Sequence, residues 1–146
     1  MKAYLDLNIV FDFLVGSRPN NIEAAQILTL FEGDRDELFT SPNAFVMGFA
    51  FLRRDRPDVS ATDHKHTLAM LRRSVDCVLI GNQEVDQALA LSPPEDMEDG
   101  MQIVLAQKCD AELIISNDKR GFRDSPIPQL TSPEFLRRWD EFIHLP

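Results

Sequence analysis

Short apolar runs alternate with amphipathic stretches along the chain. Apolar runs bounded by polar or turn-forming residues are typical of buried strands, whereas apolar residues spaced three and four apart are typical of helices. This pattern predicts strands over residues 2–5, 38–41, 75–80 and 112–116, with a short fifth strand over 128–130. It predicts helices over residues 8–15, 21–32, 44–54, 63–73, 83–91, 98–108 and 132–142.

The repeated strand–helix order indicates an α/β fold. Such alternation favours a mainly parallel sheet, here of four to five strands, with helices on both faces as a three-layer α/β/α sandwich. Two helix starts are predicted from residues that favour the N-cap position: Asn8 for the first helix and Ser132 for the last.

Length and composition narrow the class of protein further. With 146 residues, 44% hydrophobic and 27% charged, the chain is expected to form one domain over residues 1–146 and to be neither disordered nor fibrous. No apolar run approaches the roughly 20 residues needed to span a bilayer, and the N-terminus lacks a signal-peptide pattern, so we expect a cytoplasmic protein with no membrane association. Cys77 and Cys109 are expected to be small buried thiols, because they are few, distant and set in apolar sequence.

The formal net charge of −9, from 24 acidic and 15 basic residues, argues against a broad phosphate-binding surface. Any contact with nucleic acid is therefore expected to be local. Bases gather in short groups, among them Arg53-Arg54 and Lys119-Arg120. Basic residues near helix ends are equally explained by the helix dipole, so both interpretations stay open.

Three acids occupy positions that a parallel sheet would bring together. Asp6 follows the first predicted strand, Asp118 follows the fourth, and Asp99 opens the helix that leads into the fourth. Ligands of open parallel sheets bind beyond the carboxyl ends of the strands, so we expect these acids to form one acidic cleft. Carboxylate oxygens suit hard divalent cations, which makes a metal site the leading interpretation.

The residues around these acids also have structural explanations. Asn8 could serve only as a helix cap and Asp12 only as a solvated acid. Asp96 and Glu98 could simply complement the positive end of a helix dipole. The stretch 116–118 could be a plain polar turn after a strand.

Taken in order, the motifs resemble those of the PIN-domain family, the nuclease fold of VapC-type toxin ribonucleases. The resemblance covers nearly the whole chain and rests on Asp6-Leu7-Asn8, Asp96-Met97-Glu98-Asp99 and Ser116-Asn117-Asp118 within segments 5–14, 96–102 and 113–122, and on the closing segment 127–136.

The resemblance implies a metal-dependent endoribonuclease that hydrolyses RNA phosphodiester bonds. Carried over to this chain, the acids that are both catalytic and ligands of Mg²⁺ or Mn²⁺ are Asp6, Asp99 and Asp118. Asn8 and Ser116 are implied to orient those acids, with Asp96 and Glu98 as reserve candidates. The substrate-binding residues expected nearest the cleft are Arg53, Arg54, Lys119 and Arg120.

The same resemblance implies partners. VapC-type toxins pair with a small antitoxin protein that inserts a segment into the groove, and many form homodimers. A PIN-like nuclease of RNA processing or DNA repair would cut in the same way without an antitoxin encoded beside it.

One departure from the family pattern favours a different alternative. Many PIN nucleases carry another acid in the helix after the second strand, but residues 43–54 contain none, and the aligned position lies near Met47. Asn43 is a candidate polar substitute, and as a residue near the start of the helix it has an equally good structural explanation. A catalytically weak PIN fold that acts as a binding module therefore stays open, and a response-regulator-like receiver ranks last.

Other chemistry-bearing patterns are weak. His64 and His66 fall on different sides of a predicted helix, and His144 lies in the tail, so no histidine site is expected. The aromatic run Phe45, Phe49 and Phe51 is interpreted as core and interface, not as a base-stacking platform, because bases appear only from Arg53 onward.

Overall fold

The sheet of the computed structural model matches the predicted class. Within residues 1–32 and 37–143, which are those that the structure describes, five parallel strands lie in the order β3-β2-β1-β4-β5. Their bounds are β1 Ala3–Leu5, β2 Leu38–Thr40, β3 Asp76–Cys77, β4 Leu113–Ile115 and β5 Gln129–Leu130. Every neighbouring pair is parallel, which confirms the predicted mainly parallel sheet.

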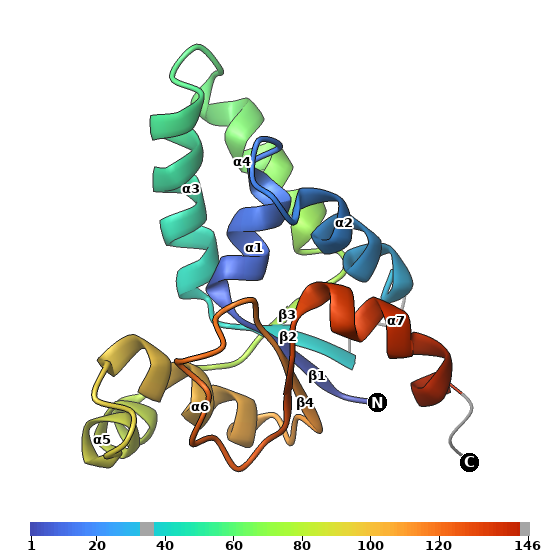
Figure 1. The fold of residues 1–146 in the computed structure, drawn as a ribbon. Helices are drawn as coiled ribbons and strands as arrows, with labels where there is room; N and C mark the ends of the chain where they lie inside the picture. The colour runs from blue at the N-terminus through green and yellow to red at the C-terminus, as the bar shows by residue number, and fades with distance from the viewer. Residues whose placement is uncertain (33–36, 144–146) are drawn as a thin grey trace.

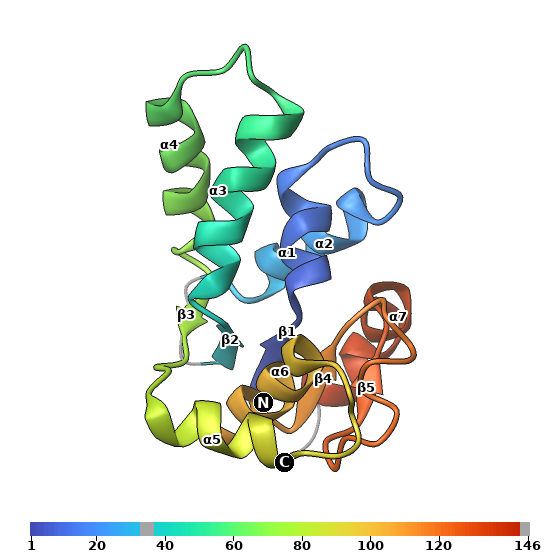
Figure 2. The same cartoon turned by 90° about the vertical axis from the view of Figure 1, so that its left-hand side faces the viewer.

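Helices cover both faces of this sheet. They are α1 Leu7–Leu14, α2 Asn21–Leu30, α3 Asn43–Asp55, α4 Ala61–Leu71, α5 Asn82–Ala90, α6 Met97–Lys108 and α7 Ser132–Ile143. Figures 1 and 2 show α1 to α4 and α7 on one side and α5 and α6 on the other. The predicted three-layer α/β/α sandwich is therefore confirmed.

Alternation along the two central strands explains why both faces are covered. Ala3 and Leu5 of β1 join the core beneath α1, α2, α3 and α7, whereas Tyr4 joins the core beneath α6. In β4, Leu113 and Ile115 face the first core and Ile114 faces the second. Successive side chains of a strand point to opposite faces, so an apolar run without polar interruption requires cover on both sides.

The order of the strands creates a crevice between β1 and β4. From β1 the chain builds outward to β2 and β3, then returns to the other side of β1 to form β4 and β5. The backbone N–H of Asp6 donates to the carbonyl of Ile115 (3.1 Å), so the two strands are joined up to their last residues. Ligands of open α/β sheets bind at such a switch point.

Both predicted helix caps are wrong. Asp6 is the N-cap of α1, and its Oδ1 accepts from the backbone N–H of Leu7 (2.7 Å). Before α7, Thr131 Oγ1 accepts from the N–H of Glu134 (3.4 Å) while Glu134 Oε2 accepts from the N–H of Thr131 (2.9 Å). This reciprocal pair is a capping box. Because Asp6 and Thr131 cap the two helices, the side chains of Asn8 and Ser132 make other contacts.

The third strand and the cysteines also differ from expectation. β3 covers only Asp76–Cys77, because its partner β2 ends at Thr40 and the chain then enters α3. Cys77 and Cys109 are free thiols, as predicted, but both are half-buried. None of the helices found in the described residues has the length and apolar character needed to cross a membrane.

Phe135 anchors the last helix. Its side chain is fully buried. The centroid of its ring lies 6.1 Å from the ring centroid of Phe31, 5.4 Å from that of Trp139 and 5.8 Å from that of Phe142.

We expect Phe135→Ala to lower the free energy of unfolding by about 3–5 kcal/mol, because the cavity left behind cannot collapse fully. The matched change Leu89→Ala, at a side chain 67% exposed, should alter it by less than about 0.5 kcal/mol. Urea midpoints measure both, and equal shifts would contradict this account.

Candidate active site

A hollow of about 290 Å³ opens beyond the carboxyl ends of β1 and β4, and we call it the acidic cleft. Its lining consists of five carboxylates with three other side chains: Asp6, Asp96, Glu98, Asp99 and Asp118, with Leu7, Asn8 and Phe11. Three separate segments supply the acids: the end of β1, the start of α6 and the loop after β4. The structure therefore brings together all five acids that the sequence singled out.

Asp6 is the most buried of these acids, with 6% of its surface exposed. Its Oδ2 accepts hydrogen bonds from Ser116 Oγ (2.6 Å) and from Asn8 Nδ2, and its Oδ1 accepts from the N–H of Leu7. Burial nevertheless raises the pKa of Asp6 from 3.8 to about 7. The donors from Ser116 and Leu7 lower that pKa, and the nearby charges of Glu98 and Asp99 raise it.

Ser116 and Asn8 connect the two strand ends. Ser116 Oγ donates to Asp6 and accepts from the N–H of Asp118 (3.1 Å). Asn8 Nδ2 donates to Ser116 Oγ (3.0 Å) as well as to Asp6, and Asn8 Oδ1 accepts from the N–H of Asn117 (3.2 Å). These contacts fix how the ends of β1 and β4 meet beneath the cleft.

The acids at the start of α6 have different surroundings. Asp96 caps this helix, since its Oδ1 accepts from the N–H groups of Glu98 (2.8 Å) and Asp99 (3.2 Å). The pKa values of Glu98 and Asp99 are raised, first by burial and next by the charge of Asp96; Asp118 raises that of Asp99 further. The sequence suggested only that Asp96 complements the helix dipole, and the structure shows that its side chain also caps the helix.

The carboxylate of Asp99 lies directly against the backbone of Gly121. A Cβ atom at position 121 would lie 2.6 Å from Asp99 Oδ1 and 2.7 Å from its Cγ. Real Cβ atoms do not approach other atoms this closely, so the glycine makes room for the acid.

Asn117 is a residue that sequence reasoning missed. Its Nδ2 donates to Asp12 Oδ2 (2.9 Å), and its Oδ1 accepts from the N–H (3.0 Å) and the Oγ (2.9 Å) of Ser132. Asn117 thus ties α1 and the start of α7 to the loop that carries Asp118. The expectation that Asp12 is solvated is wrong: it is 2% exposed and paired with Arg18 (2.5 Å). The signal available in the sequence was Asp12 itself, a charged residue on the mostly apolar α1, which needs a polar partner when it is buried.

The four predicted substrate-binding cations do not line the acidic cleft. Arg53 and Arg54 lie in the last turn of α3. Lys119 Nζ lies 3.9 Å from Glu134 Oε1, and the N–H of Arg120 donates to Asp118 Oδ1 (2.8 Å). Their role in binding substrate stays a prediction.

Two other sequence observations can be placed. Met47 is 42% exposed on α3, and the N–H of Asn43 donates to Ser41 Oγ (3.1 Å), so Asn43 sits at the helix start. His64 is buried with its Nε2 3.0 Å from the carbonyl oxygen of Arg56, and His66 is exposed. His144 lies outside the described residues.

The acids are gathered but not set for coordination. In residues 1–32 and 37–143, no group of three His, Cys, Asp or Glu side chains is arranged so that it could hold a metal ion. The kind of donor nevertheless fits a hard divalent cation, because every charged group lining the cleft is a carboxylate. Binding would require these side chains to turn toward one point.

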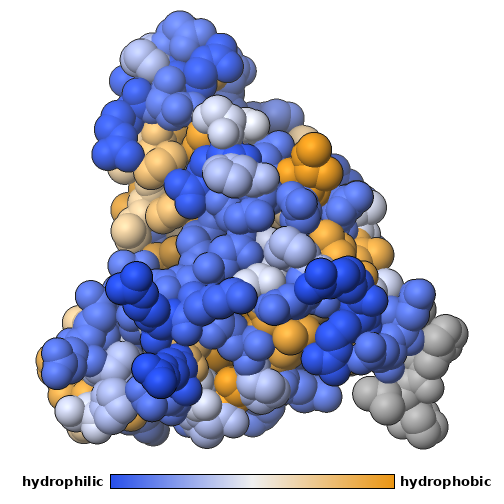
Figure 3. All heavy atoms as spheres, viewed as in Figure 1, coloured by the Kyte–Doolittle hydropathy of each residue, from blue (hydrophilic) through white to orange (hydrophobic). Residues whose placement is uncertain are grey.

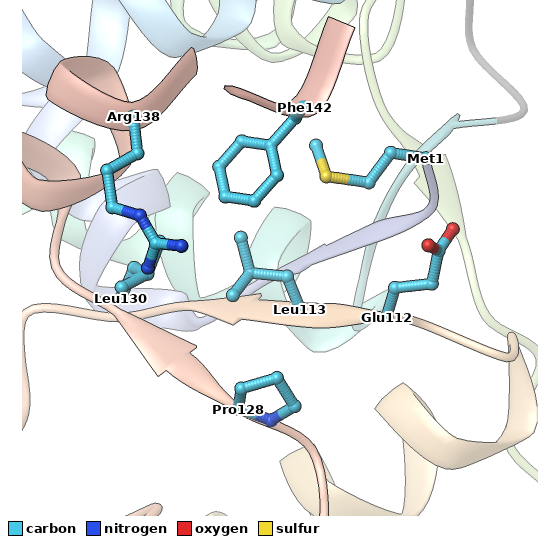
Figure 4. A pocket seen from close by; sticks show the side chains of 7 residues that line it. All are labelled: Met1, Glu112, Leu113, Pro128, Leu130, Arg138 and Phe142. Carbon is cyan, nitrogen blue, oxygen red and sulfur yellow. The ribbon is translucent and has the colours of Figure 1, made fainter. Parts of the chain in front are cut away.

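A second hollow, of about 400 Å³, lies between α7 and the strands β4 and β5 (Figure 4). Its charged groups are Glu112 and Arg138, and its other lining is apolar or proline: Met1, Leu113, Pro128, Leu130 and Phe142. Arg138 Nε donates to Glu141 (2.8 Å), and Glu112 Oε1 accepts from the N–H of Lys2 (3.0 Å). It shares no residue with the acidic cleft.

The raised pKa of Asp6 predicts a pH dependence of stability when divalent cations are absent. The folded pKa lies above the unfolded one, so the native state binds more protons between them and loses stability as pH rises through 7. From pH 5 to pH 8 we expect the free energy of unfolding to fall by roughly 2–3 kcal/mol. Urea unfolding in EDTA should show this loss in the wild type and in Asp86→Asn, an exposed control, but not in Asp6→Asn. An equal pH dependence in all three would contradict the assignment to Asp6.

Comparison with known proteins agrees with this geometry. The family model for the PIN domain matches residues 2–120. Ribonuclease VapC1 of Aquifex aeolicus (strain VF5) is 29% identical over 143 residues, covering 95% of this chain and 96% of that protein.

Two solved structures share the fold. Mycobacterium tuberculosis VapC20, a toxin that cleaves the sarcin-ricin loop, superposes with a TM-score of 0.64 at 13% identity, covering 84% of this chain and 95% of that one. Rickettsia felis VapBC2, bound to a DNA fragment from its promoter, has a TM-score of 0.63 at 10% identity, covering 90% and 98%. With the family model matching most of its length and the same fold in these structures, this chain belongs to the PIN-domain family.

Proposed function

We propose that residues 1–146 act as a single PIN-like domain, a metal-dependent endoribonuclease that hydrolyses RNA phosphodiester bonds. The observation that carries this proposal is the acidic cleft, where acids from three segments meet at the switch point of the sheet. The similarity to Ribonuclease VapC1 over 95% of the chain supports ribonuclease activity.

Asp6, Asp99 and Asp118 are the acids that we propose hold Mg²⁺ or Mn²⁺. The raised pKa values of Asp6 and Asp99 support this, since burial and mutual repulsion disfavour their charged forms and a cation would reverse that effect. A divalent cation bound there supplies an activated water at neutral pH and offsets charge at the scissile phosphate.

The remaining polar residues would support those acids. Ser116 and Asn8 each donate to Asp6 Oδ2 and so fix its orientation. Asp96 holds the backbone of the first turn of α6, from which Asp99 projects. Glu98, which also lines the cleft and has a raised pKa, remains with Asp96 a reserve candidate.

We further propose that the protein is the toxin of a toxin–antitoxin pair, held inactive by a small antitoxin protein and able to form homodimers. The similarity to proteins named VapC supports this assignment. An antitoxin gene beside the coding sequence would support it, and its absence would favour the PIN-like nuclease of RNA processing or DNA repair.

Two observations favour a second candidate, a PIN fold used as a binding module. The described residues hold no group of three side chains arranged to hold a metal ion. Residues 43–54 also contain no acid, whereas many PIN nucleases carry one in the helix after the second strand. Calorimetric titration with Mn²⁺ separates the two candidates, because a binding module need not bind the ion.

The nuclease proposal predicts that single carboxylate-to-amide changes abolish both ion binding and cleavage. Asp6→Asn, Asp99→Asn and Asp118→Asn should each lower Mn²⁺ affinity and RNA cleavage by at least about 100-fold, with circular dichroism unchanged. Asp86→Asn, an exposed acid of α5, should match the wild type. A folded wild type that binds no Mn²⁺ would reject the nuclease proposal in favour of the binding module.

Gly121 offers a test that leaves every acid in place. In Gly121→Ala the new methyl group would push the Asp99 carboxylate aside, so we expect Mn²⁺ affinity to fall by about 10-fold or more. Gly16→Ala is the matched control, because a Cβ at position 16 meets nothing within 4 Å. If both variants bind Mn²⁺ like the wild type, Asp99 is not a ligand.

A further inference from the structure

A column of three stacked groups leads from the acidic cleft to the far end of α3. Phe11, which lines the cleft, stacks on Phe51 with the ring centroids 5.1 Å apart and the planes 7° from parallel. The guanidinium carbon of Arg54 lies 4.7 Å from the centroid of the Phe51 ring. We call Phe11, Phe51 and Arg54 the aromatic column.

This arrangement changes the interpretation of the aromatic run on α3. Phe45, Phe49 and Phe51 do pack against the core, as expected, and all are only partly buried. Phe51 additionally supports a cation, which the sequence alone did not suggest. Figure 3 shows apolar surface on the flank of α3, where Val46 and Met47 are 72% and 42% exposed.

Arg54 differs from Arg18 and Arg56, two arginines near it. Arg18, 6.0 Å from the same ring, is paired with Asp12, and Arg56 makes two hydrogen bonds to Asp58 (3.0 and 2.8 Å). Arg54 has no carboxylate within ion-pair distance among the described residues, and it is exposed. A guanidinium resting on a ring is held in a defined plane while its N–H groups stay free at the edge.

The charge of the cleft makes such a cation favourable for binding RNA. Its five carboxylates repel the phosphates of an RNA strand, and the net charge of −9 provides no general attraction. An RNA strand leaving the cleft along α1 and α3 would therefore gain most from a placed cation at its edge. The planar fork of arginine suits phosphate oxygens in a two-point contact.

We propose that Arg54, positioned by Phe51, binds a backbone phosphate of the RNA strand that enters the acidic cleft. This rests on the proposed ribonuclease function. Arg54 contacts the substrate directly, whereas Phe51 acts through Arg54 and is a positioning residue. Phe11 connects this contact to the cleft.

The test measures binding of a fluorescein-labelled single-stranded RNA oligonucleotide by anisotropy, with Asp6→Asn as the background so that cleavage is suppressed. We expect Arg54→Gln to raise the Kd about five- to tenfold and to reduce the slope of log Kd against log salt by about 0.7, the value for one phosphate contact on a single strand. Arg54→Lys keeps the charge but not the planar fork, so the Kd should rise while the slope stays near that of the background. Phe51→Leu should behave like Arg54→Lys.

Two controls separate this contact from general charge. Arg73→Gln removes an exposed arginine just beyond the end of α4 and should change the Kd by less than twofold. Arg53→Gln removes the neighbouring charge without touching the ring, so its effect should be smaller than that of Arg54→Gln. Thermal unfolding reports whether Phe51→Leu has lost its fold, and the Arg54 variants, at an exposed position, decide the question in that case.

The outcomes distinguish this inference from the function on which it rests. If the wild type cuts RNA but Arg54→Gln leaves both the Kd and the KM unchanged, or Arg73→Gln weakens binding equally, the role of Arg54 is rejected and the ribonuclease stands. If the wild type with Mn²⁺ neither binds nor cuts RNA, both are rejected. Support requires a KM raised in Arg54→Gln with kcat within twofold of the wild type, together with the smaller salt slope.

Discussion

Burial of the Asp6 carboxylate at the junction of β1 and β4 is the constraint on which the other features of the site depend. Burying a charge without partners is strongly unfavourable, so the surrounding residues must either donate to it or let it hold a proton. Here Ser116, Asn8 and the N–H of Leu7 all donate, and burial still raises the pKa to about 7. The fold therefore holds an acid whose charged form is poorly solvated, and a cation bound to the carboxylate would compensate for the lost solvation.

The Asp6 carboxylate also caps α1, so the same side chain contributes to the stability of this helix and to the lining of the cleft. An N-cap normally lies at the solvent edge of a helix, but Asp6 caps from beneath the cleft because the strand leads into α1 within one residue. Ser116, at the end of β4, reaches the same oxygen that Asn8 contacts. The hydrogen bonds that join the ends of β1 and β4 therefore also orient the Asp6 carboxylate. A change that disturbs this junction should also disturb the orientation of the acid.

The gathering of the acids was predictable, whereas their network was not. Strand ends of a parallel sheet meet at one edge whatever the side chains, so Asp6, Asp99 and Asp118 could be placed near each other from periodicity and order alone. Asn117 could not, because its partners Asp12 and Ser132 come from elements whose relative packing is a tertiary property. The cap of α1 was mispredicted for a related reason: Asp6 and Asn8 are equally good cap residues, and the hydrogen bonds of Asn8 to Ser116 and Asn117 depend on how β4 packs beside β1. Likewise, β3 stops early because its partner strand ends, which no local pattern records.

Charge explains how an acidic protein could still hold RNA. A strongly basic nuclease would attract RNA along its whole surface, but here the carboxylates of the cleft and the net charge of −9 oppose approach until a cation occupies the cleft. Two of the arginines near Arg54 are already paired with carboxylates: Arg18 with Asp12 and Arg56 with Asp58. An RNA strand would then be selected by a few fixed points, a metal among the acids and an arginine held on a ring, and not by overall attraction. Such a site makes affinity depend on the shape of the strand between those points, which is how a small acidic domain could restrict the RNA that it cuts.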